Sequence, residues 1–186
     1  LGLNQKNKIF IQQVSEEGDF GVKDKTKDLI LRVRKKVQNF LKDGKKWEAR
    51  SFLENKVSEN VKNFKLRTEL ASLYKEEFGD LYLATSTLEE SLALNSSQPA
   101  VIEEIINLYD DLDQVESSTY FLQSMLDQNP ENTDLVLGVA HSLLIQDQFD
   151  NAIYYYEQLQ AKGFQSQESL VGLAFSYSQT KQYKKA

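Results

Sequence analysis

The stretch DQNPENTDLVLGVAHSLLIQDQFDNAIYYYEQLQAKGF, residues 127–164, decides the fold because it contains two short helices joined by a polar turn. Apolar residues recur at three-and-four spacing through residues 135–144 and again through 149–159, which indicates one buried face on each helix. Pro130 cannot continue a helix, so a turn precedes the first one. The polar residues 146–148 separate the two helices.

The ends of this helix pair carry ordinary start and stop signals. Thr133 or Asp134 is expected to cap the first helix, and Gly163 is expected to end the second. Two helices of about 14 residues bury little apolar surface by themselves, so the pair needs neighbours on both sides.

Varied copies of the pair occur before and after it, at a spacing of about 34 residues. The small residue at the helix crossing recurs as Ala49, Ala84, Ser118, Ala152 and Ala186. The large residue eleven positions into each unit recurs as Phe40, Tyr109, Leu143 and Tyr177, with Tyr74 or Lys75 in the second unit, depending on where a one-residue insertion lies. Turns inside the units are expected near Gly44, Gly79, Asp113 and Asp147.

The period, the alanine and aromatic positions and the Asn-Pro unit end resemble the tetratricopeptide repeat, TPR. The resemblance covers roughly residues 30–186 and implies an all-α, right-handed α-solenoid of antiparallel helix pairs. The implied units lie near residues 30–63, 64–98, 99–132, 133–166 and 167–186, the last of them truncated. The tryptophan typical of the first helix is absent, and Ser118 replaces the usual alanine. An irregular helical bundle is the alternative.

Residues 1–26 do not fit the repeat. The strand-like run 8–14 and the short apolar piece 20–22 flank a turn signal, which predicts a β-hairpin or an extended arm. Such an arm would cap the exposed face of the first repeat, and an ill-ordered tail is the alternative. The chain therefore divides into an N-terminal arm or cap, residues 1–26, and a TPR-like solenoid, residues 27–186.

Composition agrees with a helical repeat. The chain has 186 residues, is 40% hydrophobic, and contains two prolines and no cysteine, so disulfides and thiolate zinc sites are excluded. No apolar run approaches the roughly 18 residues that span a membrane. The chain begins with Leu1 and stops at Ala186 inside an expected helix, so we expect it to be part of a longer protein. The compartment stays open between cytoplasm and periplasm.

Charge is uneven along the chain, whose formal net charge is −6. Lysine and arginine outnumber the acidic residues through Arg67, and the reverse holds from Thr68 onward. Ordinary solvated faces explain this pattern, and so would two ends that meet different partners.

Catalytic chemistry finds no support in the sequence. His141 is the single histidine, lies in an expected helix and is interpreted as a groove or packing residue. Trp47 is expected to pack between adjacent helices. The acidic run 110–113 lacks the glycine and the distant glutamate of a calcium loop, and no glycine-rich phosphate loop is present. We therefore predict no enzyme activity, no cofactor and no metal site. Nucleic acid is not expected either, because the repeats after Arg67 are acidic.

The resemblance implies an inner groove lined by the first helix of each unit. Matched position by position, the groove residues are Arg34, Gln38, Lys42, Glu69, Leu73, Glu76, Glu103, Asn107, Asp110, Leu137, His141, Leu144, Val171 and Phe175. Read along the units, they are basic, then acidic, then apolar. A ligand with an apolar segment and a basic flank fits this order.

One TPR subfamily clamps the C-terminal carboxylate of chaperones with lysine and asparagine side chains. Here Glu103 accompanies Asn107, and Gly138 stands where a second asparagine belongs, so the clamp is absent. The resemblance then implies a non-catalytic scaffold that binds a protein or peptide. A regulatory domain that changes shape around a peptide is the alternative, and the truncated last repeat predicts self-association.

Overall fold

The computed structural model describes residues 25–181, which are helical except for the turns and contain no strand. The elements are α2 (Lys25–Lys42), α3 (Lys46–Glu59), α4 (Phe64–Leu73), η1 (Tyr74–Phe78), α5 (Leu81–Leu94), α6 (Pro99–Asp111), α7 (Val115–Gln128), α8 (Thr133–Ile145), α9 (Phe149–Ala161) and α10 (Gln167–Gln179). The expected arm lies outside the described residues except for Lys25 and Thr26, which begin α2.

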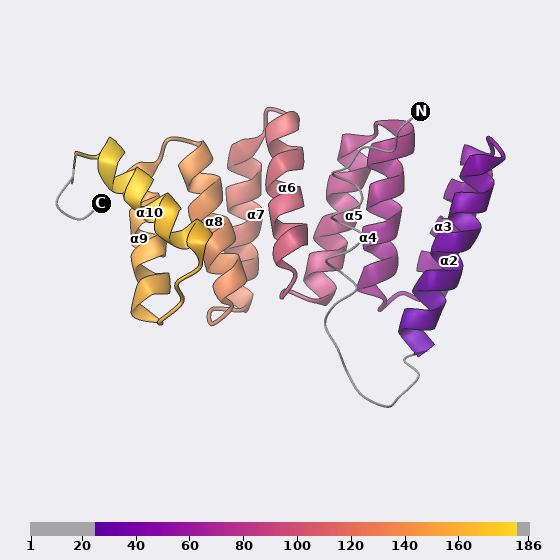
Figure 1. Ribbon diagram of the computed structural model, residues 1–186, viewed down its shortest axis with the longest axis horizontal. Coiled ribbons are helices and arrows are strands. Elements are labelled where there is room, and N and C mark those ends of the chain that lie inside the picture. The colour runs from indigo at the N-terminus through magenta and orange to yellow at the C-terminus, as the bar shows by residue number, and fades with distance from the viewer. Residues whose placement is uncertain (1–24, 182–186) are drawn as a thin grey trace.

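The helices stand side by side in one elongated row, from α2 at one end to α10 at the other (Figure 1). We call the first helix of each pair an A helix (α2, α4 with η1, α6, α8, α10) and the second a B helix (α3, α5, α7, α9). Each B helix contacts its own A helix and the A helix of the next pair, and α8 also contacts α6 and α10. One continuous apolar core therefore runs along the row, and the all-α prediction is confirmed for residues 25–181.

The turn from each A helix to its B helix contains one residue in the left-handed conformation. These residues are Gly44, Gly79, Asp113 and Asp147, with φ angles of 72°, 64°, 55° and 56°. Glycine adopts this conformation without a steric penalty, and aspartate is among the few other residues that tolerate it. In the third pair the Gln114 amide donates to the Tyr109 carbonyl at 2.7 Å, a bond that closes the helix end.

The one-residue insertion of the second unit lies in η1, which is a π-helix. From its first residue to its left-handed turn, the α4–η1 helix is one residue longer than α6, α8 and α10. A single π-turn accommodates an extra residue inside a helix, so both flanks keep their register. Tyr74 is therefore the equivalent of Tyr109, and residues 64–74 align with the other A helices without a shift.

The N-cap of α8 differs from the prediction. Asn132, and neither Thr133 nor Asp134, caps the helix, because its Oδ1 accepts from the amides of Asp134 (3.0 Å) and Leu135 (3.3 Å). The Asn132 Nδ2 also donates to the Ser96 carbonyl at 2.9 Å. The cap thus joins this pair to the preceding one.

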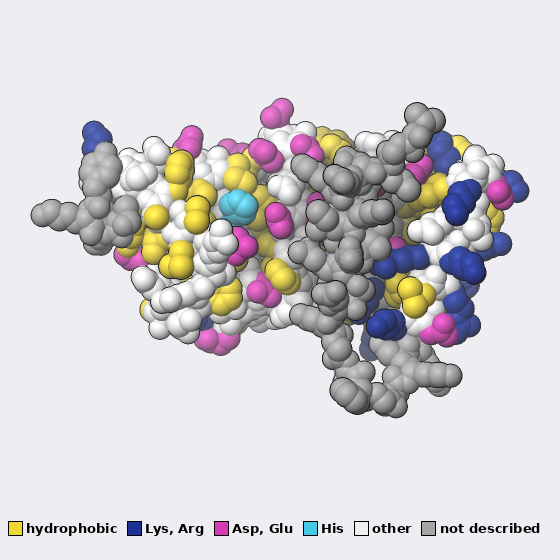
Figure 2. Space-filling view, in the orientation of Figure 1, with side chains coloured by type: hydrophobic (Ala, Val, Ile, Leu, Met, Phe, Trp, Pro, Cys, Tyr) yellow, Lys and Arg dark blue, Asp and Glu magenta, His cyan; other side chains and the backbone are white. Residues whose placement is uncertain are grey.

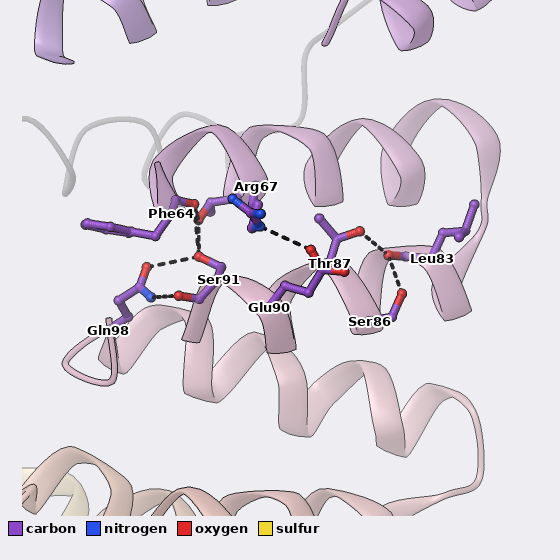
Figure 3. Close-up of polar contacts among 9 residues, drawn as sticks. Phe64, Arg67, Leu83, Ser86, Thr87, Glu90, Ser91 and Gln98 are labelled. Atoms are coloured by element: carbon purple, nitrogen blue, oxygen red, sulfur yellow. Dashed lines mark hydrogen bonds and ion pairs between the residues drawn. The ribbon is translucent and has the colours of Figure 1, made fainter. Parts of the chain in front are cut away.

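Polar side chains tie α5 to α4 and to the start of α6 (Figure 3). The buried Ser91 hydroxyl donates to the Phe64 carbonyl at 3.0 Å, and Gln98 Nε2 donates to the Ser91 carbonyl at 3.0 Å. Arg67 Nε donates to Glu90 Oε2 at 3.1 Å on the same side. These bonds fix the N-terminal end of α4 against the C-terminal end of α5.

A recurring hydrogen bond closes three of the four junctions between helix pairs in residues 25–181. In each, a tyrosine hydroxyl near the end of an A helix donates to a glutamate of the preceding B helix, which we call the Tyr–Glu contact. The pairs and their oxygen–oxygen distances are Tyr74–Glu54 (2.7 Å), Tyr109–Glu89 (2.5 Å) and Tyr177–Glu157 (2.6 Å). At the junction of α7 and α8 the equivalent residues are Gln123 and Leu143, which cannot make this bond.

The buried tyrosine of a Tyr–Glu contact makes stability depend on pH in the alkaline range. Burial, and then the hydrogen bond to Glu54, raises the pKa of Tyr74 to about 12. Because an unfolded tyrosine ionises near pH 10, folding favours the protonated phenol, whose contribution is full below about pH 10 and lost between about pH 10 and 12. We expect the Tyr74→Phe chain to lose roughly 1–3 kcal/mol less stability than the wild type across that window.

Urea unfolding just below and just above this pH window measures the difference. Tyr82→Phe is the matched control, because Tyr82 is exposed on α5 and should follow the wild type. An equal loss in the wild type and the Tyr74→Phe chain would show that Tyr74 does not carry the effect.

Candidate functional site

The exposed side chains of the A helices form one surface, which we call the A-helix face. On α6, Glu103, Asn107 and Asp110 are spaced by four and three residues, so they lie on one side of the helix, and all three are exposed. The same spacing on α8 aligns Leu137, His141 and Leu144. Because the A helices stand side by side, these rows together make a surface that crosses several pairs.

The chemistry of the A-helix face changes from one end to the other. Figure 2 shows lysine and arginine (dark blue) over α2, acidic side chains (magenta) over α6 and apolar side chains (yellow) over α8 and α10. The one histidine of the chain (cyan) lies between the acidic and the apolar parts. The order basic, acidic, apolar along the face is the order that the sequence predicts.

Most of the predicted groove residues are accessible to solvent. Gln38, Lys42, Glu76, Glu103, Asn107, Asp110, Val171 and Phe175 are exposed, and Arg34, Glu69, Leu137, His141 and Leu144 are half-buried. Because these side chains are accessible to solvent, a partner could contact them. Their role in binding stays a prediction.

Leu73 is a correction, because its side chain is only 4% exposed and belongs to the core. The sequence left the position of the one-residue insertion open, and Leu73 lines the groove only if the insertion lies before Glu69. The π-helix places the insertion after Leu73. Counted from Phe64, the positions equivalent to Glu103 and Asn107 are Thr68 and Ser72. Ser72 is exposed, and these two residues were missed for the same reason.

Two of the predicted residues bind each other. Arg34 Nε on α2 donates to Glu69 Oε1 on α4 at 2.7 Å, and both side chains are about three-quarters buried. Lys75 on η1 and Glu104 on α6 repeat this arrangement with an Nζ–Oε1 distance of 2.6 Å. Arg34 and Glu69 therefore hold successive A helices together, and the acidic charge left for a partner is that of Glu76, Glu103 and Asp110.

The apolar end of the face is unusually open. Val171 is 62% exposed, Phe175 and Leu170 are also exposed on α10, and the Phe175 ring centroid lies 6.0 Å from that of Phe149. In the first turn of α8, burial raises the pKa of the Asp134 carboxyl. Contiguous exposed apolar side chains of this kind mark surfaces that another molecule covers.

Trp47 contacts the neighbouring helix, as predicted, but it is not buried between the two helices. It lies in the first turn of α3 and is 60% exposed, and its ring meets Phe78 of η1 edge-on at a centroid distance of 4.9 Å. The Arg50 guanidinium lies 5.5 Å from the Phe78 ring. Its place at the turn edge of the row keeps most of the indole in solvent.

We also searched the described residues for a metal site and for a membrane-spanning helix. Residues 25–181 contain no group of three or more histidine, cysteine, aspartate or glutamate side chains arranged to hold a metal ion. In the acidic run 110–113, Asp113 serves the left-handed turn. None of the described helices is long and apolar enough to cross a membrane.

Comparison with solved structures finds similar folds. A tetratricopeptide repeat protein from Parabacteroides merdae aligns with 84% of this chain at a TM-score of 0.59 and 18% identity. Residues 41 to the end of MamA from Desulfovibrio magneticus RS-1 align with 88% of it at 0.54 and 14% identity, over 90% of the MamA chain. A Podospora anserina protein assigned as a kinesin light chain, with nearly identical TPR-like repeats, aligns with 88% of this chain and 91% of its own at 0.51 and 19% identity.

The chain spans 62% of the length of the Parabacteroides protein. No family model matches the sequence, and no curated protein matches it. At identities below 20% the likeness is one of fold, and it agrees with the repeat period, the turns and the helix pairs described above.

Proposed function

We propose that this chain, which has the TPR fold, is a non-catalytic scaffold that binds a peptide or a partner protein on its A-helix face. The observation that carries the proposal is the graded surface, on which exposed Glu103 and Asp110 of α6 are followed by half-buried side chains of α8 and then by exposed Val171 and Phe175 of α10. The resemblance further implies a right-handed superhelix, which would curve this face around its partner.

The stack supports the proposal by holding the face in one arrangement. The A helices are fixed by the continuous core, by the Arg34–Glu69 and Lys75–Glu104 ion pairs and by the Tyr–Glu contacts. A surface on rigid elements loses little conformational entropy when a partner binds.

The partner chemistry follows from the two ends of the face. Carboxylates on α6 attract lysine and arginine, and burial of apolar side chains on α8 and α10 supplies affinity. The segment that fits best therefore carries basic residues beside an apolar run. Such a segment is a peptide strand or an amphipathic helix of the partner.

Charge reversal on α6 tests this proposal. Twelve-residue peptides are selected from a random library on the purified chain, and the binding of the best one is measured by fluorescence anisotropy. We expect the Glu103→Lys/Asp110→Lys chain to bind it about tenfold or more weakly, because two attractive charges become repulsive. We also expect raised salt to weaken binding to the wild-type chain, by screening these charges.

The matched control is Asp127→Lys/Asp150→Lys, which makes the same charge change on the B helices α7 and α9. If both variants bind the peptide similarly weakly, the effect comes from net charge alone. If the α6 variant binds as tightly as the wild type, the A-helix face is not the binding site. Analytical ultracentrifugation of the same samples tests the proposed self-association at the α10 end.

A further inference from the structure

A cleft of about 380 Å³ lies between α7 and α9, above the end of α8. Its lining residues are Glu116, Thr119, Tyr120, Gln123, Leu143, Gln146, Gln148, Asn151, Tyr154 and Tyr155. We call it the tyrosine cleft. Its walls are B helices, and none of its residues belongs to the predicted groove, so it is independent of the A-helix face.

The cleft occurs at the one junction of residues 25–181 that lacks the Tyr–Glu contact. At the other three, the hydroxyl of an A-helix tyrosine donates to a glutamate of the preceding B helix. Here Leu143 replaces the tyrosine and Gln123 replaces the glutamate, and both line the cleft. Leu143 lacks the ring and Gln123 lacks the carboxylate of the Tyr–Glu contact, so the junction that holds the cleft departs from the other three.

Two of the lining residues, Thr119 and Gln146, belong to a network of polar side chains. Gln146 Nε2 donates to Thr119 Oγ1 at 2.6 Å and to the Ser142 carbonyl at 3.0 Å. The buried Ser142 hydroxyl lies 2.5 Å from Ser118 Oγ and 2.6 Å from Thr119 Oγ1. A satisfied network of this kind holds Thr119 and Gln146 in place before any ligand binds.

The walls present aromatic rings to solvent. Tyr120 on α7 is 73% exposed and Tyr154 on α9 is 60% exposed, and the two occupy equivalent positions of consecutive units. Tyr155 adds a third ring, edge-on to Tyr154 with a centroid distance of 5.2 Å. Exposed tyrosines around a cleft offer flat apolar surfaces together with hydroxyl groups for hydrogen bonds.

The residues that line the tyrosine cleft carry little charge, which favours a neutral ligand. The cleft contains no lysine or arginine and only one carboxylate, Glu116, in a chain of which 27% is charged. An anionic ligand would find no cation here. A neutral ligand would find amide groups on Gln123, Gln148 and Asn151 beside the three rings.

We propose that the tyrosine cleft binds a proline-rich segment in the polyproline II conformation. The proline rings of such a segment pack against aromatic side chains. Its backbone carbonyls make no hydrogen bonds within the polyproline II helix, so they are available to accept hydrogen bonds from amide and hydroxyl donors. Proline brings no N–H that would need an acceptor. Glu116 at the edge of the cleft favours a basic residue beside the prolines.

Titration of the full chain with an N-acetylated, C-amidated octaproline tests the proposal, with binding followed by calorimetry and by shifts of backbone amide resonances. We expect shifts confined to α7, α9 and the end of α8. The Tyr120→Ala/Tyr154→Ala chain should bind at least tenfold more weakly. Tyr82→Ala is the matched control, because Tyr82 is 63% exposed on α5 outside the cleft and should leave affinity unchanged.

A second variant closes the cleft without removing its exposed rings. Gln123→Glu/Leu143→Tyr restores the residues of the Tyr–Glu contact, so we expect octaproline binding to be lost while the melting temperature does not fall. The proposal is overturned if octaproline does not bind the wild type, if the tyrosine or closing variants bind it as tightly as the wild type, or if a neutral oligosaccharide such as maltohexaose binds in its place.

Discussion

Replacing Gly138 by valine is expected to destabilise the chain by roughly 3 kcal/mol, by overpacking the contact between α6 and α8. A Cβ atom built on Gly138 would lie 2.4 Å from Cγ2 of Ile102 and 3.5 Å from Cδ1 of Leu122. Ile102 is buried and cannot move aside without disturbing the core. The close approach of these two A helices therefore depends on the missing side chain.

A double-variant cycle separates this clash from other effects of the substitution. Ile102→Ala alone should cost roughly 2–5 kcal/mol, because it leaves a cavity in the core. Gly138→Val/Ile102→Ala exchanges similar volumes across the contact, so its cost should fall short of the sum of the single changes by about 2 kcal/mol or more. Urea unfolding monitored by circular dichroism measures all four chains.

Leu137→Val is the control for the β-branched residue itself, since Leu137 is half-buried in the same helix. It should cost less than about 1 kcal/mol. Strict additivity in the cycle would mean that Gly138 and Ile102 do not meet, and the packing of α6 on α8 would then be wrong.

The sequence predicts the helix pairs well because their signals are local. Turn residues such as Gly79 and Asp147 stand where one backbone conformation is required, and the apolar residues between them follow a helical period. Neither signal depends on what lies across the core. The turns and the helices between them therefore lie in the structure at the positions that the sequence predicts.

The register inside the second unit could not be fixed in this way. A single extra residue between Phe64 and Gly79 can be inserted at several points of an amphipathic sequence with little change in its pattern. The π-turn at Tyr74–Phe78 is selected by the packing of both flanks at once. Leu73 was predicted to line the groove and Ser72 was not, because only tertiary contacts distinguish the alternatives.

Of the two candidate surfaces, the A-helix face was predicted from the sequence and the tyrosine cleft was not. The basic, acidic and apolar order of the A-helix face is visible in sequence because it follows from helix position alone. The tyrosine cleft was missed, although the replacement of tyrosine and glutamate by Leu143 and Gln123 could have signalled it. Its meaning depends on the Tyr–Glu contact, which joins residues 20 positions apart on different helices.

Deleting Glu76 is expected to leave the fold intact, whereas deleting Asn107 is expected to cost more than about 5 kcal/mol. Glu76 lies in η1, so its removal converts the π-turn to ordinary α-helix and preserves the register of Tyr74 before it and Gly79 after it. It is also exposed, so the loss should stay near 1 kcal/mol or below.

Asn107 is exposed as well, but it lies in the middle of α6, which has no extra residue to give up. Its removal rotates everything that follows by about 100° around the helix axis, because one residue is about 1/3.6 of a turn. The fully buried Leu108 would leave the core, and Tyr109 would lose its bond to Glu89. One buried leucine alone is worth roughly 2–5 kcal/mol.

Thermal and urea unfolding of the full chain compare the two deletions directly, each against the wild type. A large loss on deleting Glu76 would show that η1 is needed for stability in its own right. Equal tolerance of both deletions would show that A helices slide freely in register, and the placement of the A-helix face would then lose its basis. A fixed register requires a small loss of stability on deleting Glu76 and a large loss on deleting Asn107. The same one-residue deletion is tolerated only in the α4–η1 helix, because that helix already contains one extra residue.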